Sequence, residues 1–263
     1  MGKKSYRRSK GIRWDLILFG MGTVLLIVYG CLQYKNIKDR HDYENTIVRL
    51  EEMKEYTLPT KPETEKENEQ EEEEVSYQKF FDANEDMIGW LHIPETEIDY
   101  PVMQTMDDEE YYLRRNFFKE DDRNGTLILD TDSDISKTSN NLIIHGHNMK
   151  SGAMFAALKD FEDAEYTKEH SRILFYTEDE KREYEVIAVF RSRVYTVEDK
   201  VFKYYQFFEA RNQEEFDNFY NNIKKLSEFD TGVTAEFGDE FITLSTCEYH
   251  TKNGRLVVVG KRI

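Results

Sequence analysis

The stretch FITLSTCEYHTKNGRLVVVGKR, residues 241–262, contains two strand-like runs on either side of a polar loop. The loop ends in Asn253-Gly254, a dipeptide that is a strong signal for a tight turn. The pattern therefore predicts an antiparallel β-hairpin. In this hairpin Cys247 ends the first strand and Arg255 begins the second, so both residues lie at the same end of the sheet.

A thiol and a guanidinium at one strand end form a chemically sensible reactive site. Nearby positive charge lowers the pKa of a cysteine and so favours the nucleophilic thiolate. A guanidinium also donates hydrogen bonds to a developing oxyanion. We therefore predict Cys247 as a nucleophile with Arg255 beside it. The alternatives are a buried, unreactive Cys247 and an Arg255 that is an ordinary surface charge.

A nucleophilic thiol also needs an acid or base, and histidine is the usual one. The segment NNLIIHGHNMKSG, residues 140–152, places a buried-looking apolar run before His145, Gly146 and His147. Gly146 lets the backbone bend at the end of this strand. We therefore expect His147 to reach a site at the strand ends, whereas His145 stays in the strand.

The remaining histidines are weaker candidates, and no metal site is predicted. His250 is near Cys247 only in sequence, and three others lie in ordinary surroundings: His41, His92 and His170. His145 and His147 share one strand face, but neither a third ligand, nor zinc-type cysteine spacing, nor an HExxH helix accompanies them. We expect no catalytic metal.

Short strand-like runs recur along the globular part of the chain, and helical patterns are few. Turn residues bound these runs, which are rich in β-branched and aromatic residues: 88–93, 97–102, 126–129, 142–145, 172–176, 184–194, 241–246 and 255–259. A short helix is expected at 153–158 and a longer one at 212–227, with apolar residues at i, i+3 and i+4. The pattern predicts a mainly β fold with peripheral helices (α+β), either a barrel or a sandwich.

The N-terminal part of the chain predicts a membrane anchor. Residues 14–33 are mostly apolar and reach the roughly 20 residues needed to cross a bilayer core. The basic residues in 1–13 predict a cytoplasmic tail and an outward-facing remainder. A cleaved signal peptide and lipidation of Cys31 are alternatives, and both leave the folded part in the same compartment.

The next segment predicts a stalk that holds a domain off the membrane. Residues 34–75 are polar, with a possible helix at 35–56, and 62–74 are almost purely acidic and therefore solvated. The globular part then occupies residues 76–263. The net charge of −17 argues against a nucleic-acid partner.

Three motifs, in this order, resemble the sortase family. Residues 88–94, IGWLHIP, followed by IDYPV at 98–102 and by 125–130, resemble its opening strands. IHGHNM at 144–149 resembles the segment with the sortase histidine, which corresponds to His147, although position 145 is often Tyr there. TLSTC at 243–247 resembles the TLxTC motif, with Arg255 where sortases place their arginine. The likeness covers residues 76–263, and the stretch 204–229 resembles class B sortases in particular.

The resemblance implies a closed β-barrel of about eight strands and a membrane-anchored cysteine transpeptidase outside the cell. Cys247 would attack the Thr carbonyl in the C-terminal sorting signal of a secreted protein, for which class B relatives suggest an Asn-Pro-x-Thr-like pentapeptide. His147 would be the acid and base, and Arg255 would steady the oxyanion or the peptide. Ser245 and Thr246 either contact the substrate or are simply strand residues. The acceptor would be a peptidoglycan amine, and no metal or organic cofactor is required.

Two other functions fit the same residues. A hydrolytic cysteine endopeptidase would use water in place of the amine, although the local signatures of papain-like proteases and caspases are absent. A tethered, non-catalytic peptide-binding domain would leave Cys247 without chemistry. The acceptor dependence of the product and the reactivity of Cys247 distinguish these alternatives.

Overall fold

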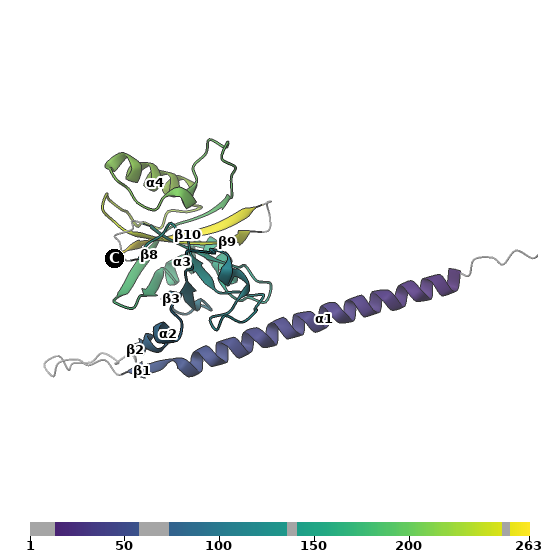
Figure 1. The fold of residues 1–263 in the computed structure, drawn as a ribbon. Helices are drawn as coiled ribbons and strands as arrows, with labels where there is room; N and C mark the ends of the chain where they lie inside the picture. The colour runs from purple at the N-terminus through teal and green to yellow at the C-terminus, as the bar shows by residue number, and fades with distance from the viewer. Residues whose placement is uncertain (1–13, 58–73, 136–140, 249–252) are drawn as a thin grey trace, which may run out of the picture. The chain divides into compact units, whose positions relative to one another are not determined.

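The computed structural model describes residues 14–57, 74–135, 141–248 and 253–263 (Figure 1). The predicted cytoplasmic tail, residues 1–13, lies outside the described residues. The chain divides into two compact units, residues 1–42 and 43–263. The second unit contains all the strands and every predicted site residue.

Eight strands of the second unit form a closed barrel in the order β10-β8-β7-β3-β4-β5-β6-β9. Their bounds are β3 (Met87–His92), β4 (Asp99–Met103), β5 (Leu127–Leu129), β6 (Asn141–Gly146), β7 (Arg172–Tyr176), β8 (Lys181–Arg193), β9 (Phe241–Glu248) and β10 (Gly254–Arg262). The pairs β4–β5 and β6–β9 are parallel, and the other neighbours are antiparallel. All eight predicted strands are confirmed, and the architecture is the barrel, not the sandwich.

Two further short strands form a small ribbon outside the barrel. β1 (Glu55–Thr57) pairs antiparallel with β2 (Glu74–Ser76). No sequence pattern predicts these strands, because each is only three residues long and lies in a strongly polar context.

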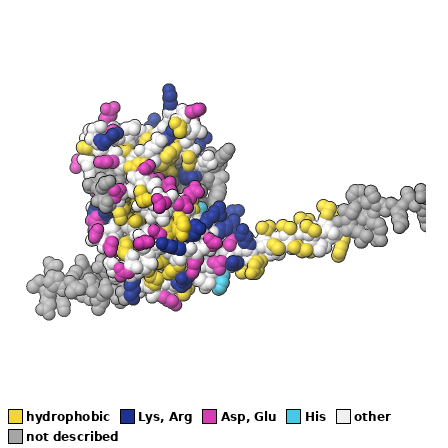
Figure 2. All heavy atoms as spheres, in the orientation of Figure 1, with side chains coloured by type: hydrophobic (Ala, Val, Ile, Leu, Met, Phe, Trp, Pro, Cys, Tyr) yellow, Lys and Arg dark blue, Asp and Glu magenta, His cyan; other side chains and the backbone are white. Residues whose placement is uncertain are grey.

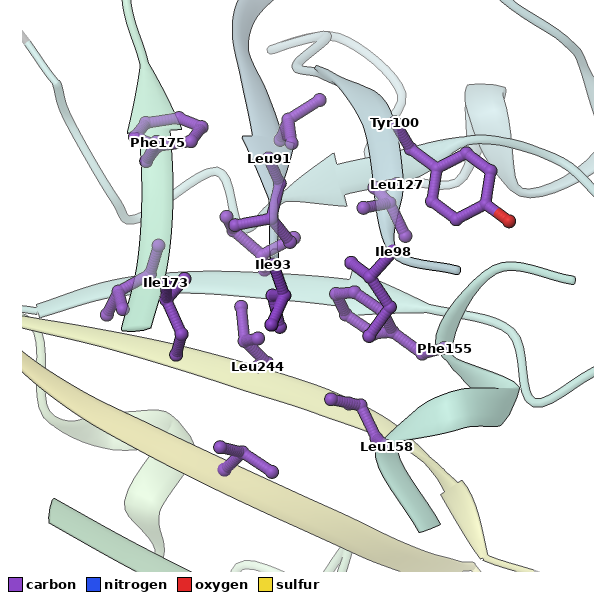
Figure 3. Packing of buried hydrophobic residues seen from close by; sticks show 14 of the residues in the cluster. Leu91, Ile93, Ile98, Tyr100, Leu127, Phe155, Leu158, Ile173, Phe175 and Leu244 are labelled. Carbon is purple, nitrogen blue, oxygen red and sulfur yellow. The ribbon is translucent and has the colours of Figure 1, made fainter. Parts of the chain in front are cut away.

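The interior of the barrel is filled by aliphatic and aromatic side chains (Figure 3). Alternate residues of a strand point to opposite faces, so each strand contributes every second residue to this core. Burial of one such side chain stabilises the fold by about 1.5–3 kcal/mol. Residues labelled in Figure 3 include Leu91, Ile93, Leu127, Phe155, Ile173, Phe175 and Leu244.

Helix α4 (Gln213–Leu226) covers part of the outside of the barrel and confirms the predicted long helix. The Asn212 side chain caps its N-terminus by accepting a hydrogen bond from the Glu215 amide, 3.0 Å away. The predicted apolar stripe packs onto outward-facing residues of the last three strands, including Phe190, Phe241, Val257 and Val259.

The other helical segments are short. They are α2 (Gln78–Ala83), the 3-10 turns η1 (Tyr111–Arg114), η2 (Phe155–Glu162) and η3 (Tyr204–Gln206), and α3 (Ala164–Glu169). The helix expected at 153–158 is η2, which begins two residues later and ends four residues later. η1 lies in the long β4–β5 connection and η3 lies between β8 and α4, and both contribute contacts to the site.

Helix α1 (Trp14–Met53) is continuous through the region predicted as anchor and helical stalk. Its last turns belong to the second unit and pack on the barrel, with Leu50 buried. The Tyr43 and Tyr100 hydroxyls are 2.8 Å apart. Just after the helix, Lys54 Nζ lies 2.6 Å from an Asp99 carboxylate oxygen.

The first part of α1 carries apolar side chains that the protein does not cover. Large exposed residues recur between Leu18 and Leu32, and Figure 2 shows hydrophobic side chains along this stretch of the helix. By length and composition, the helix from Leu18 to Met53 is able to cross a membrane. This finding agrees with the predicted anchor.

Candidate active site

The predicted hairpin exists, and its register confirms the expected neighbours. β9 and β10 are antiparallel, and the Cα partner of Cys247 is Arg255. Asn253 has φ of 59°, the left-handed conformation that asparagine tolerates at a turn. The structure describes the backbone of Cys247, whereas its side chain and residues 249–252, including His250, are outside the described part.

Strand β6 pairs in parallel with β9, on the side of β9 opposite to β10. Gly146 is the Cα partner of Thr246, and β6 ends there. The residues that follow this pair are His147 and Cys247. Backbone positions 147, 247 and 255 therefore form one row across three neighbouring segments of the barrel, with the cysteine in the middle.

The His147 ring is held by a main-chain acceptor from η1. Its Nε2 lies 2.8 Å from the Leu113 carbonyl oxygen, which can only accept, so Nε2–H is the donor. The His147 carbonyl in turn accepts a hydrogen bond from the Phe155 amide at 2.9 Å. The side chain is half-buried. Both ring and backbone of this residue are thus fixed by neighbouring segments.

Gly146 allows this arrangement for a reason other than the one predicted. It is the last residue of β6 and is not among the glycines with positive φ, so the expected glycine-dependent bend is wrong. A Cβ at this position would lie 2.5 Å from Leu127 and 2.7 Å from the Phe155 ring. The glycine is required by the close packing of the strand end against the core.

The Arg255 guanidinium forms no ion pair with a carboxylate among the described side chains. Its Nη1 donates a hydrogen bond to the Gly254 carbonyl, 3.0 Å away, and its side chain is half-buried. A guanidinium beside β9 is able to bind a developing negative charge or a peptide carbonyl.

Ser245 and Thr246 are buried and have partners inside the protein. The Ser245 hydroxyl lies 2.7 Å from the hydroxyl of Tyr204 in η3. Thr246 Oγ1 donates to the Gly146 carbonyl at 2.8 Å and so links the nucleophile strand to β6. These contacts position the end of β9, while a direct contact with substrate stays a prediction.

His145 belongs to a different group of side chains. Its Nε2 lies 3.3 Å from Asp130 Oδ2, and Glu109 completes a set whose ligand atoms are all within 4.8 Å of one another. Burial and the neighbouring Asp130 raise the pKa of Glu109. Among the described residues these three are close enough to hold a metal ion, and no sequence motif points to Asp130 and Glu109. That catalysis needs no metal stays a prediction.

Two of the remaining histidines have structural contacts away from the row. His92 Nδ1 lies 3.3 Å from Asp99 Oδ1. His170 follows α3 and its Nδ1 lies 2.9 Å from the Tyr166 carbonyl oxygen, so Nδ1–H donates. Their surroundings agree with the prediction that they are ordinary residues.

Sequence reasoning missed the groups that hold the predicted residues in place. The Leu113 carbonyl has no sequence signal, because every residue carries a carbonyl. Tyr204 reads as one more aromatic residue in the apolar stretch before α4. A usable signal was Asn124-Gly125, a turn dipeptide, since Gly125 lies directly against Leu113.

Comparison with known proteins identifies the family. The sortase domain family matches residues 91–263. Sortase B of Listeria monocytogenes is 35% identical over 182 residues, which cover 68% of this chain and 71% of that protein. A crystal structure of sortase B from B. anthracis in complex with AAEK1 matches with a TM-score of 0.70 and 27% identity, covering 86% of this chain and 99% of that one.

A further structure supports the same assignment. The Staphylococcus aureus sortase B–substrate complex matches with a TM-score of 0.63 and 26% identity, over 71% of this chain and 84% of that one. The matched range 91–263 includes the whole row of positions 147, 247 and 255. The closed barrel, the motifs and these similarities agree, and the chain therefore belongs to the sortase family, as a class B cysteine transpeptidase.

Proposed function

We propose that this sortase cleaves a C-terminal sorting signal after Thr and transfers the acyl group to a cell-wall amine. Cys247 is the nucleophile, His147 the acid and base, and Arg255 the oxyanion or peptide ligand. The observation that carries the proposal is the row of positions 147, 247 and 255 across β6, β9 and β10. It puts one residue of each required chemical type at the same end of the barrel.

The first half of the reaction forms a thioacyl enzyme. The Cys247 thiolate attacks the Thr carbonyl, so a carbon–sulfur bond forms and the carbonyl oxygen becomes negative. The Arg255 guanidinium donates hydrogen bonds to that oxygen. The carbon–nitrogen bond then breaks, and protonated His147 gives its proton to the leaving amine.

The second half returns the enzyme to its starting state. An amine, here proposed to come from a peptidoglycan cross-bridge, attacks the thioester carbonyl while neutral His147 accepts its proton. The carbon–sulfur bond breaks and the Cys247 thiolate leaves. Each proton lent by His147 is recovered, and no metal or organic cofactor takes part.

The proposed substrates are secreted proteins, with an Asn-Pro-x-Thr-like pentapeptide as the class B expectation.

Attachment of such proteins to peptidoglycan requires the enzyme to face outward. We therefore propose residues 14–33 as a single-pass anchor, 1–13 as the inner tail, 34–75 as the stalk and 76–263 as the outer catalytic domain. The exposed apolar side chains of α1 between Leu18 and Leu32 support the anchor. Protease added outside intact cells should cleave the catalytic domain, and its full protection would contradict this orientation.

The reaction is tested with the full-length chain in detergent micelles. We expect that a panel of sorting peptides, followed by mass spectrometry, yields an acyl adduct on Cys247 that an added amine acceptor converts to a ligated product. The Cys247→Ala variant is the control and forms no adduct. Release of free acid alone at saturating acceptor would identify a hydrolase. An unmodified Cys247 with every peptide and with a thiol-reactive peptide analogue would identify a non-catalytic binding domain.

A further inference from the structure

The hydrogen bond of His147 determines which ring nitrogen is available for chemistry. A neutral imidazole carries its proton on one nitrogen only, and Nε2 donates to the Leu113 carbonyl at 2.8 Å. Nδ1 is therefore the basic nitrogen, and it has no hydrogen-bond partner among the described residues. As long as the Leu113 carbonyl stays in place, it favours the tautomer with the proton on Nε2 and fixes the orientation of the His147 ring.

Leu113 belongs to η1, and main-chain hydrogen bonds from residues 122–126 hold this turn in place. The Tyr112 carbonyl accepts from the Thr126 amide at 2.9 Å, and the Arg114 carbonyl accepts from the Asp122 amide at 3.0 Å. These bonds hold the residues on both sides of Leu113. The Leu113 carbonyl, which lies between these two, accepts the hydrogen bond from His147.

Gly125 lies against the back of the same turn. Its φ is +65°, and a Cβ there would lie 2.5 Å from the Leu113 oxygen and 2.8 Å from the Leu113 carbonyl carbon. The Tyr112 oxygen would also be only 2.8 Å away. All three atoms are main chain, so no side-chain rotation relieves the contact. Any side chain at this position displaces the acceptor of His147.

We propose that Gly125 is a positioning residue for the transpeptidase reaction. It touches neither substrate nor Cys247; it acts by letting the Leu113 carbonyl approach the His147 ring, which leaves Nδ1 as the nitrogen that exchanges protons with the amines. This inference rests on the proposed role of His147.

The test is Gly125→Ala in the full-length chain, with Gly232→Ala as the matched control. Gly232 has φ of +78° but nothing within 4 Å of its Cβ position, so the control carries the backbone strain without the collision. We expect kcat of Gly125→Ala to fall about 10- to 100-fold, because small misplacements of catalytic groups cost up to this much. KM should change less than kcat. Gly232→Ala should stay within about twofold of the parent protein.

The second readout is the tautomer of His147, measured by ¹⁵N NMR with labelled histidine and assigned with His147→Gln. In the parent protein with the ring neutral, Nε2 should carry the proton, and in Gly125→Ala this preference should weaken. A proton on Nδ1 in the parent protein overturns the proposal even if the variant does not fold. Lower turnover with an unchanged tautomer, or unchanged turnover, overturns it as well.

The proposed catalytic role of His147 and the proposed positioning role of Gly125 are tested by different variants. If His147→Ala retains turnover, the proposed function of the histidine is wrong, while the NMR result still decides whether Gly125 sets the ring. If His147→Ala is inactive but Gly125→Ala is as active as Gly232→Ala, only the positioning role is wrong.

Discussion

His147 and His145 are two residues apart, yet their surroundings differ. His147 follows the end of β6 beside the nucleophile strand, with its Nε2 fixed by a main-chain carbonyl. His145 lies within β6 and pairs with Asp130 at a distance of 3.3 Å. A ring whose second nitrogen has no hydrogen-bond partner among the described residues is suited to proton transfer, whereas the His145 ring already lies against a carboxylate.

We predict that His147→Ala lowers kcat/KM by about 10²- to 10⁴-fold, the usual contribution of a general acid–base group. His145→Ala and His250→Ala should each retain most of the activity. The measurement is the initial rate of ligation with a saturating amine acceptor. Equal losses in all three variants would refute the choice of His147.

Arg255 should be sensitive to replacement even by lysine. Lysine keeps the charge but loses the planar fork that binds an oxyanion or carbonyl with two donors. We predict that Arg255→Ala lowers the rate of acylation by about 10²- to 10³-fold, with a smaller loss for Arg255→Lys. Rapid-quench measurement of the thioacyl enzyme checks this, and Arg211→Ala, which removes an exposed arginine paired with Glu215, is the control. Wild-type acylation by Arg255→Ala would exclude the oxyanion role.

The sequence points to the proposed reacting residues but not to the groups that hold them in place. Cys247, His147 and Arg255 stand out because a thiol, an imidazole and a guanidinium have distinctive chemistry and fall near strand ends. The Leu113 carbonyl is invisible because main-chain groups have no identity in a sequence. Gly146 was singled out for a bend, but packing against Phe155 is the reason for it.

At the scale of elements, local pattern predicted the strands and the long helix, but not how they join. Alternation and turn residues depend on neighbours in sequence, so β3 to β10 and α4 were found. The parallel pairing of β6 with β9 joins residues about 100 positions apart, and no local pattern encodes it. The prediction of a closed barrel rested on the family resemblance, because the strand pattern alone also allowed a sandwich.

The contact between η3 and β9 is a testable link between elements. The hydroxyls of Tyr204 and Ser245 are 2.7 Å apart and both residues are buried. We predict that Tyr204→Phe and Ser245→Ala each lower the free energy of unfolding by about 1–3 kcal/mol, since each leaves a buried hydroxyl without this partner. The double variant should lose less than the sum, as urea denaturation would show. Additive losses would mean that the two hydroxyls are not coupled.

At the scale of the whole second unit, a partly buried ion pair joins the residue after α1 to the barrel. The Lys54 side chain is only 5% exposed and contacts Asp99 of β4. Burial alone would raise the pKa of Asp99, but the adjacent His92, Lys54 and Trp90 lower it to about 2. Removal of Asp99 would leave a buried ammonium without this partner, which is costly.

The ion pair makes stability depend on pH in an acidic window. A carboxyl whose folded pKa lies below its unfolded value stabilises the protein above the unfolded pKa, and this stabilisation is lost as pH falls from about 4 to about 2. We predict that Asp99→Asn lowers the free energy of unfolding by about 2–3 kcal/mol at pH 7. The difference from the parent protein should shrink towards pH 2, as denaturation at several pH values would show. A difference that does not change with pH would contradict the assignment.

The hairpin of β9 and β10 follows every other strand in chain order and lies between β6 and β8. Without the docked hairpin the remaining strands form an open sheet, and position 147 lacks β9 as a neighbour. Closing the barrel and assembling the proposed site therefore require the same long-range β6–β9 pairing, which loop-closure entropy opposes. We expect activity during refolding to recover together with closure of the barrel.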